Sequence, residues 1–393
     1  MLIREIKQAV IFAGGTGERL LPLTGDIPKP MVVVAGRPFL EHLLLLLKEN
    51  GIEEAVILVS HLPEKIKDYF GDGARLGLKI KYVFSEKPGS GITGTRLKKA
   101  EPLLDELFLL LYCDNYWPLQ LEKLFPFHQS QQVLATVTIY NNRDGRGEYG
   151  AENNIHAADD GLVQLYDRER KDRRLNGIDI GFFIVNKAVL DWVPAEYFSF
   201  EKDLLPKLIE KKQLAGYRTD HPYYPITNLT LLQEAERFLT PKKIIFLDRD
   251  GVINKKMPEH DYVKSWQEFQ FLPGAIEGLR RLTVAGYKIF LITNQQGVGK
   301  GLMTEGDLQS IHEKMSAALT AAGVKIMAIY YCPHLESAGC YCRKPQPGLL
   351  FRAAREHYLD LTKSFFIGDS PSDLEAGRRA GCRTIMFKEF IRG

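Results

Sequence analysis

The chain is predicted to be an α/β protein made of two doubly wound, parallel-sheet domains. Short apolar runs alternate with longer amphipathic segments along its length, which is the pattern of strands joined by crossover helices. At 393 residues the chain is also too long for one ordinary core. A break at 240–243, Thr-Pro-Lys-Lys, precedes a new apolar run, so we expect one domain over residues 1–239 and another over 243–393.

The first domain is expected to alternate strands and helices up to residue 239. Apolar runs, several of them rich in β-branched residues, predict strands at 9–12, 55–59, 79–84, 107–112, 133–139, 161–166 and 178–185. Apolar residues at helical spacing predict helices at 38–50, 63–70, 119–130 and 229–238.

The second domain repeats this alternation. Its short apolar runs predict strands at 244–247, 288–292, 328–331, 364–367 and 383–387. Its longer amphipathic segments predict helices at 274–285, 305–322, 348–358 and 372–380.

Composition excludes several classes of function. The 52 basic and 49 acidic residues leave a net charge of +3, which gives no reason to expect a nucleic-acid or membrane partner. The amino end is charged where a signal peptide is apolar, and the longest leucine run, Leu43 to Leu47, is too short to span a bilayer. Five cysteines do not resemble a secreted disulfide framework. We therefore expect a cytoplasmic protein with small-molecule partners.

The strongest chemical signal is Asp248-Arg-Asp250-Gly251, at the end of a predicted strand. Alternate residues at the carboxyl end of a parallel strand project into the same crevice. One carboxylate can then attack phosphorus while the other handles the proton of the leaving group, and Gly251 permits a sharp turn. Taken alone, the pattern also fits a calcium loop or a plain turn.

Three later segments supply the other parts of such a centre. Thr293 ends a strand with a hydroxyl for a phosphate oxygen, Lys344 brings positive charge, and Asp369 ends a strand with a carboxylate suited to Mg²⁺. Together with the first motif, these residues resemble the haloacid-dehalogenase-like phosphatases over 243–392. The resemblance implies a nucleophilic Asp248 and a general acid/base Asp250. It also implies phosphate binding by Thr293 and Lys344, and Mg²⁺ held by Asp248, Asp369 and the backbone of Asp250.

Three thiols and one imidazole lie within eleven positions, at Cys332, His334, Cys340 and Cys342. Tetrahedral zinc takes such a ligand set, although three free thiols beside a surface histidine would give the same pattern. Because all four positions are filled, we expect a structural ion. The ion would stiffen a loop that leads directly into Arg343 and Lys344.

This loop narrows the resemblance to the zinc-loop phosphatases that act on D-glycero-D-manno-heptose 1,7-bisphosphate, and to their relatives that act on histidinol phosphate. Asn294 opens a segment that resembles the glycine-rich substrate loop of the heptose group. Arg343 matches a position there that meets the substrate's phosphate. The interval between Asp250 and Thr293 has no room for a separate cap domain, so we expect loops to shape access.

In the first domain, a predicted strand is followed by Gly14-Gly15-Thr-Gly17-Glu-Arg19. Glycines let backbone N–H groups approach phosphate oxygens, and Arg19 adds charge for a triphosphate. Taken alone, such a loop could be a simple turn, but Lys29 follows in the proline-stiffened segment Pro-Lys-Pro-Met. Together these features resemble the sugar-1-phosphate nucleotidyltransferases over about residues 7–239.

That resemblance implies attack by a sugar-1-phosphate oxygen on the α-phosphorus of an NTP, with release of pyrophosphate. Arg19 and Lys29 would contact phosphates. Asp114 would hold Mg²⁺, although an aspartate there could also be a helix cap. Positions that match the family's base and sugar contacts are Gly91, Thr95 and Asp179.

The chain departs from the transferase family at one place. A second metal-binding acid usually precedes the last helix, but Pro-Ile-Thr-Asn stands there, at 225–228. Three explanations follow. Asp179 or Asp220 substitutes for the acid, one metal suffices, or this domain only binds a nucleotide sugar.

The two halves together predict an enzyme with two activities that requires Mg²⁺ and Zn²⁺. The phosphatase would remove the C7 phosphate of a heptose 1,7-bisphosphate. The transferase would join the remaining 1-phosphate to a nucleotide, GMP from GTP by family analogy, to give an activated heptose for a bacterial surface polysaccharide such as lipopolysaccharide. A histidinol-phosphate phosphatase and a mannose-1-phosphate guanylyltransferase-like domain stay open as alternatives.

Overall fold

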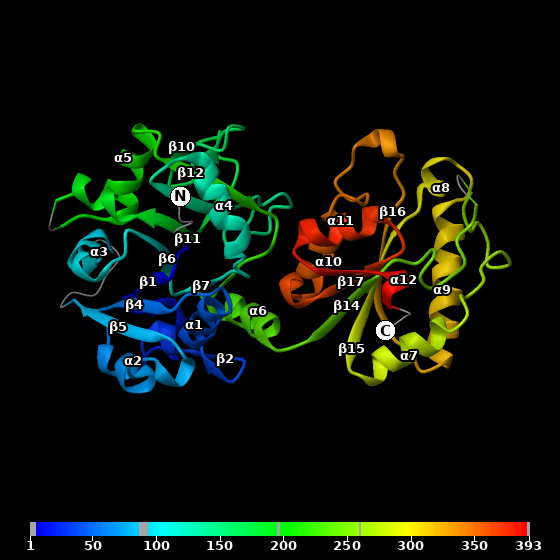
Figure 1. The fold of residues 1–393 in the computed structure, drawn as a ribbon, viewed down its shortest axis with the longest axis horizontal. Helices are drawn as coiled ribbons and strands as arrows, with labels where there is room; N and C mark the ends of the chain where they lie inside the picture. Colours follow the sequence, from blue (N-terminus) through cyan, green and yellow to red (C-terminus); the bar gives the residue numbers. More distant parts are fainter. Residues whose placement is uncertain (1–4, 86–92, 195–196, 259–260, 391–393) are drawn as a thin grey trace. The chain divides into compact units, whose positions relative to one another are not determined.

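The computed structural model describes residues 5–85, 93–194, 197–258 and 261–390. The chain divides into two compact units, Met1–Leu239 and Thr240–Gly393, and each is described by itself. In each unit helices flank a central sheet (Figure 1). Both units therefore belong to the α/β class that the alternating pattern predicts.

A seven-stranded sheet forms the centre of the first unit. Its order is β12 (Leu214–Thr219), β8 (Ala135–Tyr140), β11 (Ile178–Asn186), β6 (Leu107–Tyr112), β1 (Gln8–Ala13), β4 (Glu54–Val59) and β5 (Lys79–Phe84). Six strands share one direction, as expected, while β11 runs antiparallel to both β6 and β8. The reason is that no helix lies between β8 and β11, and a strand that returns without a crossover helix pairs antiparallel.

The helices of the first unit are α1 (Phe39–Glu49), α2 (Pro63–Phe70), α3 (Thr93–Ala100), α4 (Leu121–Gln131), α5 (Leu205–Glu210) and α6 (Leu229–Leu239). Four of them lie within two residues of their predicted bounds. The helices α3 and α5 and the strand β12 escaped prediction because each spans only six to eight residues, too few to show a clear period.

Short strand pairs lie beside the main sheet of the first unit. They are β2 (Val33–Val34) with β3 (Arg37–Pro38), β7 (Asn115–Tyr116) with β13 (Tyr224–Pro225), and β9 (Ile155–Ala157) with β10 (Val163–Tyr166). The strand predicted at 161–166 is thus β10, which pairs with β9, while Leu162 just before it forms an isolated antiparallel bridge with Ala215 of β12.

The second unit contains a five-stranded, wholly parallel sheet. Its order is β16 (Ile326–Cys332), β15 (Tyr287–Asn294), β14 (Lys243–Leu247), β17 (Phe365–Gly368) and β18 (Arg383–Met386). Its helices are α7 (Ala275–Val284), α8 (Gln296–Gly299), α9 (Glu305–Ala321), α10 (Gly348–His357), α11 (Pro371–Ala380) and α12 (Phe387–Phe390).

Two hydrophobic cores cover the two faces of this second sheet. Ile244 and Phe246 of β14 pack in a core with residues of α10 and α11. Ile245 and Leu247, which alternate with them, pack in a core with residues of α7 and α9. A strand buried on both faces must be apolar throughout, which explains why β14 reads as an uninterrupted apolar run.

Each sheet changes winding direction beside its first strand. In the second unit the chain moves from β14 outward to β15 and β16, and then returns to β17 on the other side. In the first unit, β1 lies between β4 and β6 in the same way. Crevices form at the carboxyl ends of strands at such switch points, and both predicted sites follow these strands.

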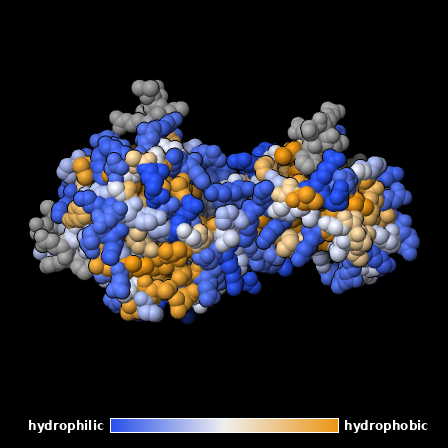
Figure 2. All heavy atoms as spheres, turned by 90° about the horizontal axis from the view of Figure 1, so that it is seen from below, coloured by the Kyte–Doolittle hydropathy of each residue, from blue (hydrophilic) through white to orange (hydrophobic). Residues whose placement is uncertain are grey.

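The surface of both units in Figure 2 mixes polar and apolar side chains, with an apolar patch on the first unit. Among the described residues, no helix combines the length and apolar character that a membrane span requires.

Candidate active sites

Asp248 follows β14 directly, and the chain turns sharply three residues later. Gly251 has φ +86°, and a Cβ added there would lie 2.3 Å from Oδ2 of Asp369. Both the backbone angle and the lack of space therefore require glycine at this position. The turn allows Asp250 and Asp369 to approach the same crevice.

A cavity of about 420 Å³ lies at this edge of the sheet. Its lining includes all five residues on which the predicted phosphatase centre depends: Asp248, Asp250, Thr293, Lys344 and Asp369. They come from four separate segments of the chain. Parallel strands place their carboxyl ends side by side, which is why residues so far apart in sequence meet here.

Lys344 is buried and lies between two carboxylates. Its Nζ is 2.8 Å from Oδ1 of Asp248 and 2.6 Å from Oδ1 of Asp373, and it donates to the carbonyl of Ile292 at 2.8 Å. Burial raises the pKa of Asp248 to about 7, while Lys344 opposes this rise. The lysine thus provides fixed positive charge beside the candidate nucleophile.

Asp250 accepts hydrogen bonds on both carboxylate oxygens. Arg249 donates from Nη2 to Oδ1 and Oδ2 at 2.9 and 2.8 Å, Asn254 donates to Oδ1 at 2.8 Å, and Gln295 donates to Oδ2 at 2.8 Å. Burial opposes ionisation of Asp250, but these donors outweigh it and hold its pKa below the ordinary value. The carboxylate is therefore fixed in one orientation.

The carboxylates of Asp248, Asp369 and Asp373 offer oxygens that all lie within 4.8 Å of one another. Oδ1 of Asp369 is buried and has no hydrogen-bond partner among the described residues. Its Oδ2 accepts from Nζ of Lys256 at 2.9 Å. A buried carboxylate oxygen without a donor, beside another carboxylate, fits a hard divalent cation that prefers oxygen ligands.

Asn294 and Arg343 also line this cavity. The side chain of Asn294 makes two hydrogen bonds of 3.1 Å with the backbone of Lys344, one as donor and one as acceptor. Arg343 donates to Oε1 of Gln296 at 3.3 Å. Asn294 therefore holds the lysine loop in place, and the guanidinium of Arg343 stands at the cavity wall.

The four zinc-ligand candidates come together in one cluster. Sγ of Cys332 lies 3.5 Å from that of Cys340 and 3.3 Å from that of Cys342, and Nδ1 of His334 lies 3.2 Å from Sγ of Cys342. All four donor atoms lie within 4.8 Å of one another, and all three thiols are free of disulfides. Three sulfurs and one ring nitrogen gathered this closely can hold a metal ion.

The first unit has a cavity of about 530 Å³ beside the loop that follows β1. The glycine loop supplies Gly14, Gly15 and Gly17 to its wall. A Cβ on Gly14 would lie 1.9 Å from Nη1 of Arg96, so the end of that arginine would have to move, and the φ of +74° at Gly17 favours glycine there. The loop can therefore bring backbone N–H groups close to an anion.

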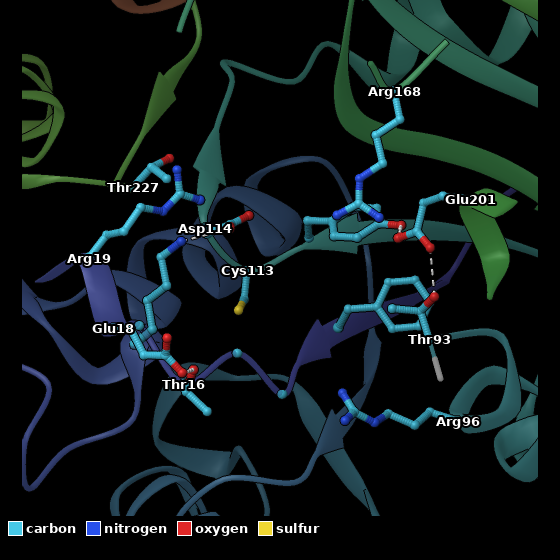
Figure 3. Close-up of a pocket in the computed structure, with 16 residues that line it drawn as sticks. Thr16, Glu18, Arg19, Thr93, Arg96, Cys113, Asp114, Arg168, Glu201 and Thr227 are labelled. Carbon is cyan, nitrogen blue, oxygen red and sulfur yellow. Dashed lines mark hydrogen bonds and ion pairs between the residues drawn. The ribbon is translucent and has the colours of Figure 1, made fainter. Parts of the chain in front are cut away.

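Both cationic and acidic side chains line this cavity (Figure 3). Figure 3 shows Arg19 and Thr227 on one side and Arg168 and Glu201 on the other, with Asp114 between them. Nζ of Lys29 lies 2.7 Å from Oδ2 of Asp114, which follows β6. Arg19, Lys29 and Asp114, which the sequence predicts as phosphate and metal contacts, all line the cavity.

Two other predicted contacts, Thr95 and Asp179, are described by the structure but do not line this cavity. The hydroxyl of Thr95 accepts from the backbone N–H of Phe198 at 3.0 Å. Asp179 accepts from the N–H of Gly181 at 2.8 Å, and burial raises its pKa to about 7. Gly91 lies outside the described residues.

The place of the expected second acid is filled by a hydroxyl. Thr227 lines the cavity and donates to Oε1 of Glu148 at 2.6 Å. Asp220, one of the predicted substitutes, instead pairs with Arg143 at 2.9 Å and accepts from Asn141 at 3.0 Å. The described lining thus offers Asp114 together with Glu18 and Glu201 as its acids.

Glu201 is the acid that sequence reasoning missed. It accepts from Thr93 at 2.8 Å, from Ser199 at 2.7 Å, and from the phenol of Tyr112. These residues come from α3, β6 and the segment before α5, and no local motif connects them. Their convergence depends wholly on tertiary structure.

Two family models match separate stretches of the chain. Residues 8–224 match the family described as nucleotidyl transferase, and residues 341–389 match the HAD-hydrolase-like family. The crystal structure of UDP-glucose pyrophosphorylase from Acinetobacter baumanii resembles the chain with a TM-score of 0.50 and 18% identity, covering 59% of this chain and 93% of that one. This likeness concerns the fold.

The second unit is similar to curated phosphatases. D-glycero-beta-D-manno-heptose-1,7-bisphosphate 7-phosphatase of Pasteurella multocida (strain Pm70) is 42% identical over 154 residues, which cover 37% of this chain and 82% of that protein. D-glycero-alpha-D-manno-heptose-1,7-bisphosphate 7-phosphatase of Mycobacterium bovis (strain ATCC BAA-935 / AF2122/97) is 46% identical over 132 residues, covering 33% and 69%.

Proposed function

The chain belongs to the nucleotidyl transferase family over residues 8–224, and its second unit belongs to the family of heptose-1,7-bisphosphate 7-phosphatases; on this premise we propose that it is a bifunctional enzyme that makes an activated heptose. Residues 1–239 would carry the transferase and residues 243–393 the phosphatase. The observation that supports this most directly is the one cavity lined by Asp248, Asp250, Thr293, Lys344 and Asp369.

The phosphatase reaction would proceed through a covalent intermediate. A carboxylate oxygen of Asp248 attacks the C7 phosphorus of the heptose bisphosphate, and the bond from phosphorus to the sugar oxygen breaks. The negative phosphoryl group bound beside Asp250 raises the pKa of that carboxyl, so Asp250 takes up a proton in the complex. Asp250 gives this proton to the leaving oxygen, and the sugar leaves as an alcohol. Water, deprotonated by Asp250, then attacks the phosphorus of the aspartyl phosphate and releases inorganic phosphate.

Charged side chains around the cavity would support both steps. Lys344 and Thr293 bind the phosphoryl oxygens, and Arg343 contacts the second phosphate of the substrate. Mg²⁺, held by Asp248, Asp369 and the backbone of Asp250, would supply further positive charge against those oxygens.

The thiol and imidazole cluster is proposed to hold a structural Zn²⁺. All four positions are protein donors, which leaves none for water and matches structural zinc sites more than catalytic ones. Lys344 follows Cys342 by two residues, so the ion would fix the loop that delivers the catalytic lysine.

The transferase reaction would need little covalent work from the protein. An oxygen of the heptose 1-phosphate attacks the α-phosphorus of an NTP, and pyrophosphate leaves. The glycine loop, Arg19 and Lys29 would bind the triphosphate, and Asp114 would hold Mg²⁺. Gly91, Thr95 and Asp179 are proposed to serve the base and sugar, although Thr95 and Asp179 do not themselves line the cavity. GTP is the proposed nucleotide.

The test is to incubate the purified protein with each anomer of the bisphosphate and each NTP, and to assay phosphate and pyrophosphate separately. We expect phosphate release without any NTP, and pyrophosphate release only after phosphate has been removed. Histidinol phosphate and mannose 1-phosphate serve as competing substrates. A higher kcat/KM for histidinol phosphate than for both heptose anomers would overturn the proposed phosphatase substrate.

A second candidate for the first unit is a binding module that does not catalyse. The observation that favours it is Thr227 at the position of the expected acid. NTP binding measured by calorimetry, with no pyrophosphate from any sugar phosphate, would support this candidate and contradict the transferase.

A further inference from the structure

Arg249 stands between the two aspartates of the phosphatase centre but does not line the cavity among the described residues. Its side chain is wholly buried, which is rare for arginine. An arginine needs hydrogen-bond acceptors for its five N–H groups when water is excluded. The hydrogen-bond acceptors that contact Arg249 therefore indicate its role.

Most of these partners belong to the catalytic carboxylate. Arg249 donates from Nε to Oδ1 of Asp250 at 3.3 Å and from Nη2 to both carboxylate oxygens. Nη2 also donates to Oε1 of Gln295 at 3.1 Å, and Gln295 in turn donates to Asp250 and to Thr293. The guanidinium thus holds Asp250 directly and through one amide.

The far end of the guanidinium is held by a histidine. Nη1 of Arg249 lies 3.1 Å from Nε2 of His312, which belongs to α9. Burial and the neighbouring Arg249 lower the pKa of His312 to about 3, so its ring is neutral at ordinary pH. Nε2 therefore accepts the hydrogen bond, and His312 fixes the guanidinium from behind.

The two catalytic aspartates have separate cationic partners. Lys344 pairs with Asp248 and Asp373, whereas Arg249 pairs with Asp250. A loss of Arg249 would leave the lysine and the nucleophile in place. The separation makes it feasible to disturb the proton-transfer group without disturbing the attacking group.

We propose that Arg249 and His312 are positioning residues for Asp250, which they hold in the orientation that passes a proton to the leaving sugar oxygen. This inference deepens the proposed phosphatase function and rests on it. Neither residue touches substrate; each acts through the carboxylate. A misplaced carboxylate transfers protons poorly even when the nucleophile is intact.

A leaving-group comparison distinguishes positioning of Asp250 from general damage to the fold. A sugar alkoxide is a poor leaving group and needs a proton, whereas 4-nitrophenolate leaves without one. The variants to compare are His312→Gln, Arg249→Met and the conservative Arg249→Lys. His357→Gln serves as the matched control, because His357 is a partly buried histidine whose ring contacts are Phe290 and Tyr330.

The measurement is the rate of the first step, by rapid quench, with the heptose bisphosphate and with 4-nitrophenyl phosphate. We expect Arg249→Met to slow the sugar reaction by roughly 100-fold and His312→Gln by about 10-fold, while the nitrophenyl reaction changes by less than about 3-fold. Arg249→Lys should recover part of the rate, and His357→Gln should change neither reaction.

Two outcomes would overturn the proposal. One is an equal loss on both substrates in His312→Gln, whose smaller change keeps the test valid if Arg249→Met does not fold. The other is an unchanged sugar reaction in both variants. Wild-type protein that releases no phosphate from either substrate would instead contradict the proposed function itself, so the two failures are distinguishable.

Discussion

The two candidate active sites differ in how their charges are held before a ligand arrives. In the phosphatase unit, Lys344 and Arg249 have side chains only 3% and 0% exposed, and each pairs with a carboxylate. In the transferase unit, Arg19 and Arg168 are exposed at the cavity. Lys29 is buried, with a side chain 9% exposed, but Asp114, with which it pairs, is 37% exposed. The phosphatase cations are thus buried and paired before a ligand binds, whereas both arginines and the acid of the transferase site remain accessible to a ligand.

This difference agrees with the two reactions proposed. A covalent mechanism needs a nucleophile and a proton donor fixed to within fractions of an ångström, which buried ion pairs provide. Transfer to a sugar phosphate depends on positioning the substrates and on neutralising the charge of a triphosphate. The bound triphosphate and its metal would themselves order many of the charged side chains around them. The four predictions below test this contrast, beginning with the largest effect.

Replacing the nucleophile should abolish one activity and leave the other. Asp248→Asn removes the attacking oxygen, so phosphate release should fall by at least about 1,000-fold. Pyrophosphate release from heptose 1-phosphate supplied directly should stay within about 2-fold, since the transferase cavity lies in the other unit. Glu313→Gln, an acid-to-amide change on the surface of α9, is the control. Phosphate release that survives in Asp248→Asn would remove the covalent mechanism.

The transferase site should lose activity when its ion pair is broken. Lys29→Met and Asp114→Asn should each lower pyrophosphate release by about 100-fold, because each removes a group placed for phosphate or metal. Phosphate release should be unchanged. Lys65→Met, on the exposed face of α2, controls for loss of a lysine. Equal pyrophosphate rates in Lys65→Met and Lys29→Met would contradict the assignment of the cavity.

Removing the metal from the cysteine cluster should destabilise the second unit alone. Cys340→Ser, or dialysis against a chelator, should lower its melting temperature by about 5–10 °C and reduce phosphate release, because the loop that carries Lys344 loosens. The melting of the first unit should not change. Cys382→Ser, a buried cysteine outside the cluster, is the matched variant. Absence of stoichiometric zinc by elemental analysis would argue against this metal.

The smallest effect expected is a pH dependence in the first unit. Burial raises the pKa of Asp179 from its ordinary value of 3.8 to about 7, so the folded state holds this proton more tightly than the unfolded state. Stability from this group is complete below about pH 4 and is lost as pH rises towards 7. Asp179→Asn should flatten the fall in melting temperature between pH 5 and 7 by a few degrees, about 2–4 °C for each kcal/mol.

The control for this experiment is Asp68→Asn, on the exposed surface of α2. It should leave the pH dependence of melting as it is in the wild type. A slope unchanged by Asp179→Asn would show that other groups cause the dependence.

The two sites also differ in how far sequence patterns reveal them. The phosphatase residues Asp248, Thr293 and Asp369 lie at or just after strand ends, so a parallel sheet alone predicts that they meet. Around the transferase cavity, Glu201, Thr93 and Tyr112 come from elements without a common motif. Their hydrogen bonds follow from long-range packing, which local patterns do not encode.

Tertiary structure also changed the role of particular residues. Thr95 lies in the expected segment, but its hydroxyl is occupied by the backbone of Phe198. Asn294 uses both ends of its amide on the backbone of Lys344, which the strand-end pattern does not show. Side-chain partners depend on rotamers and on neighbours distant in sequence, so residue identity alone leaves them open.

Sequence patterns alone were sufficient for the α/β class, the alternation of strands and helices, and the strand ends after which the acids and the glycine loop lie. These features depend on local periodicity and on the geometry of parallel strands, which act over a few residues. The reversed direction of β11, the buried support of Asp250 by Arg249 and His312, and the acids that border the transferase cavity became apparent in the folded chain alone. Those arrangements arise from contacts between segments far apart in the chain, where packing and electrostatics select among partners that the linear order does not distinguish.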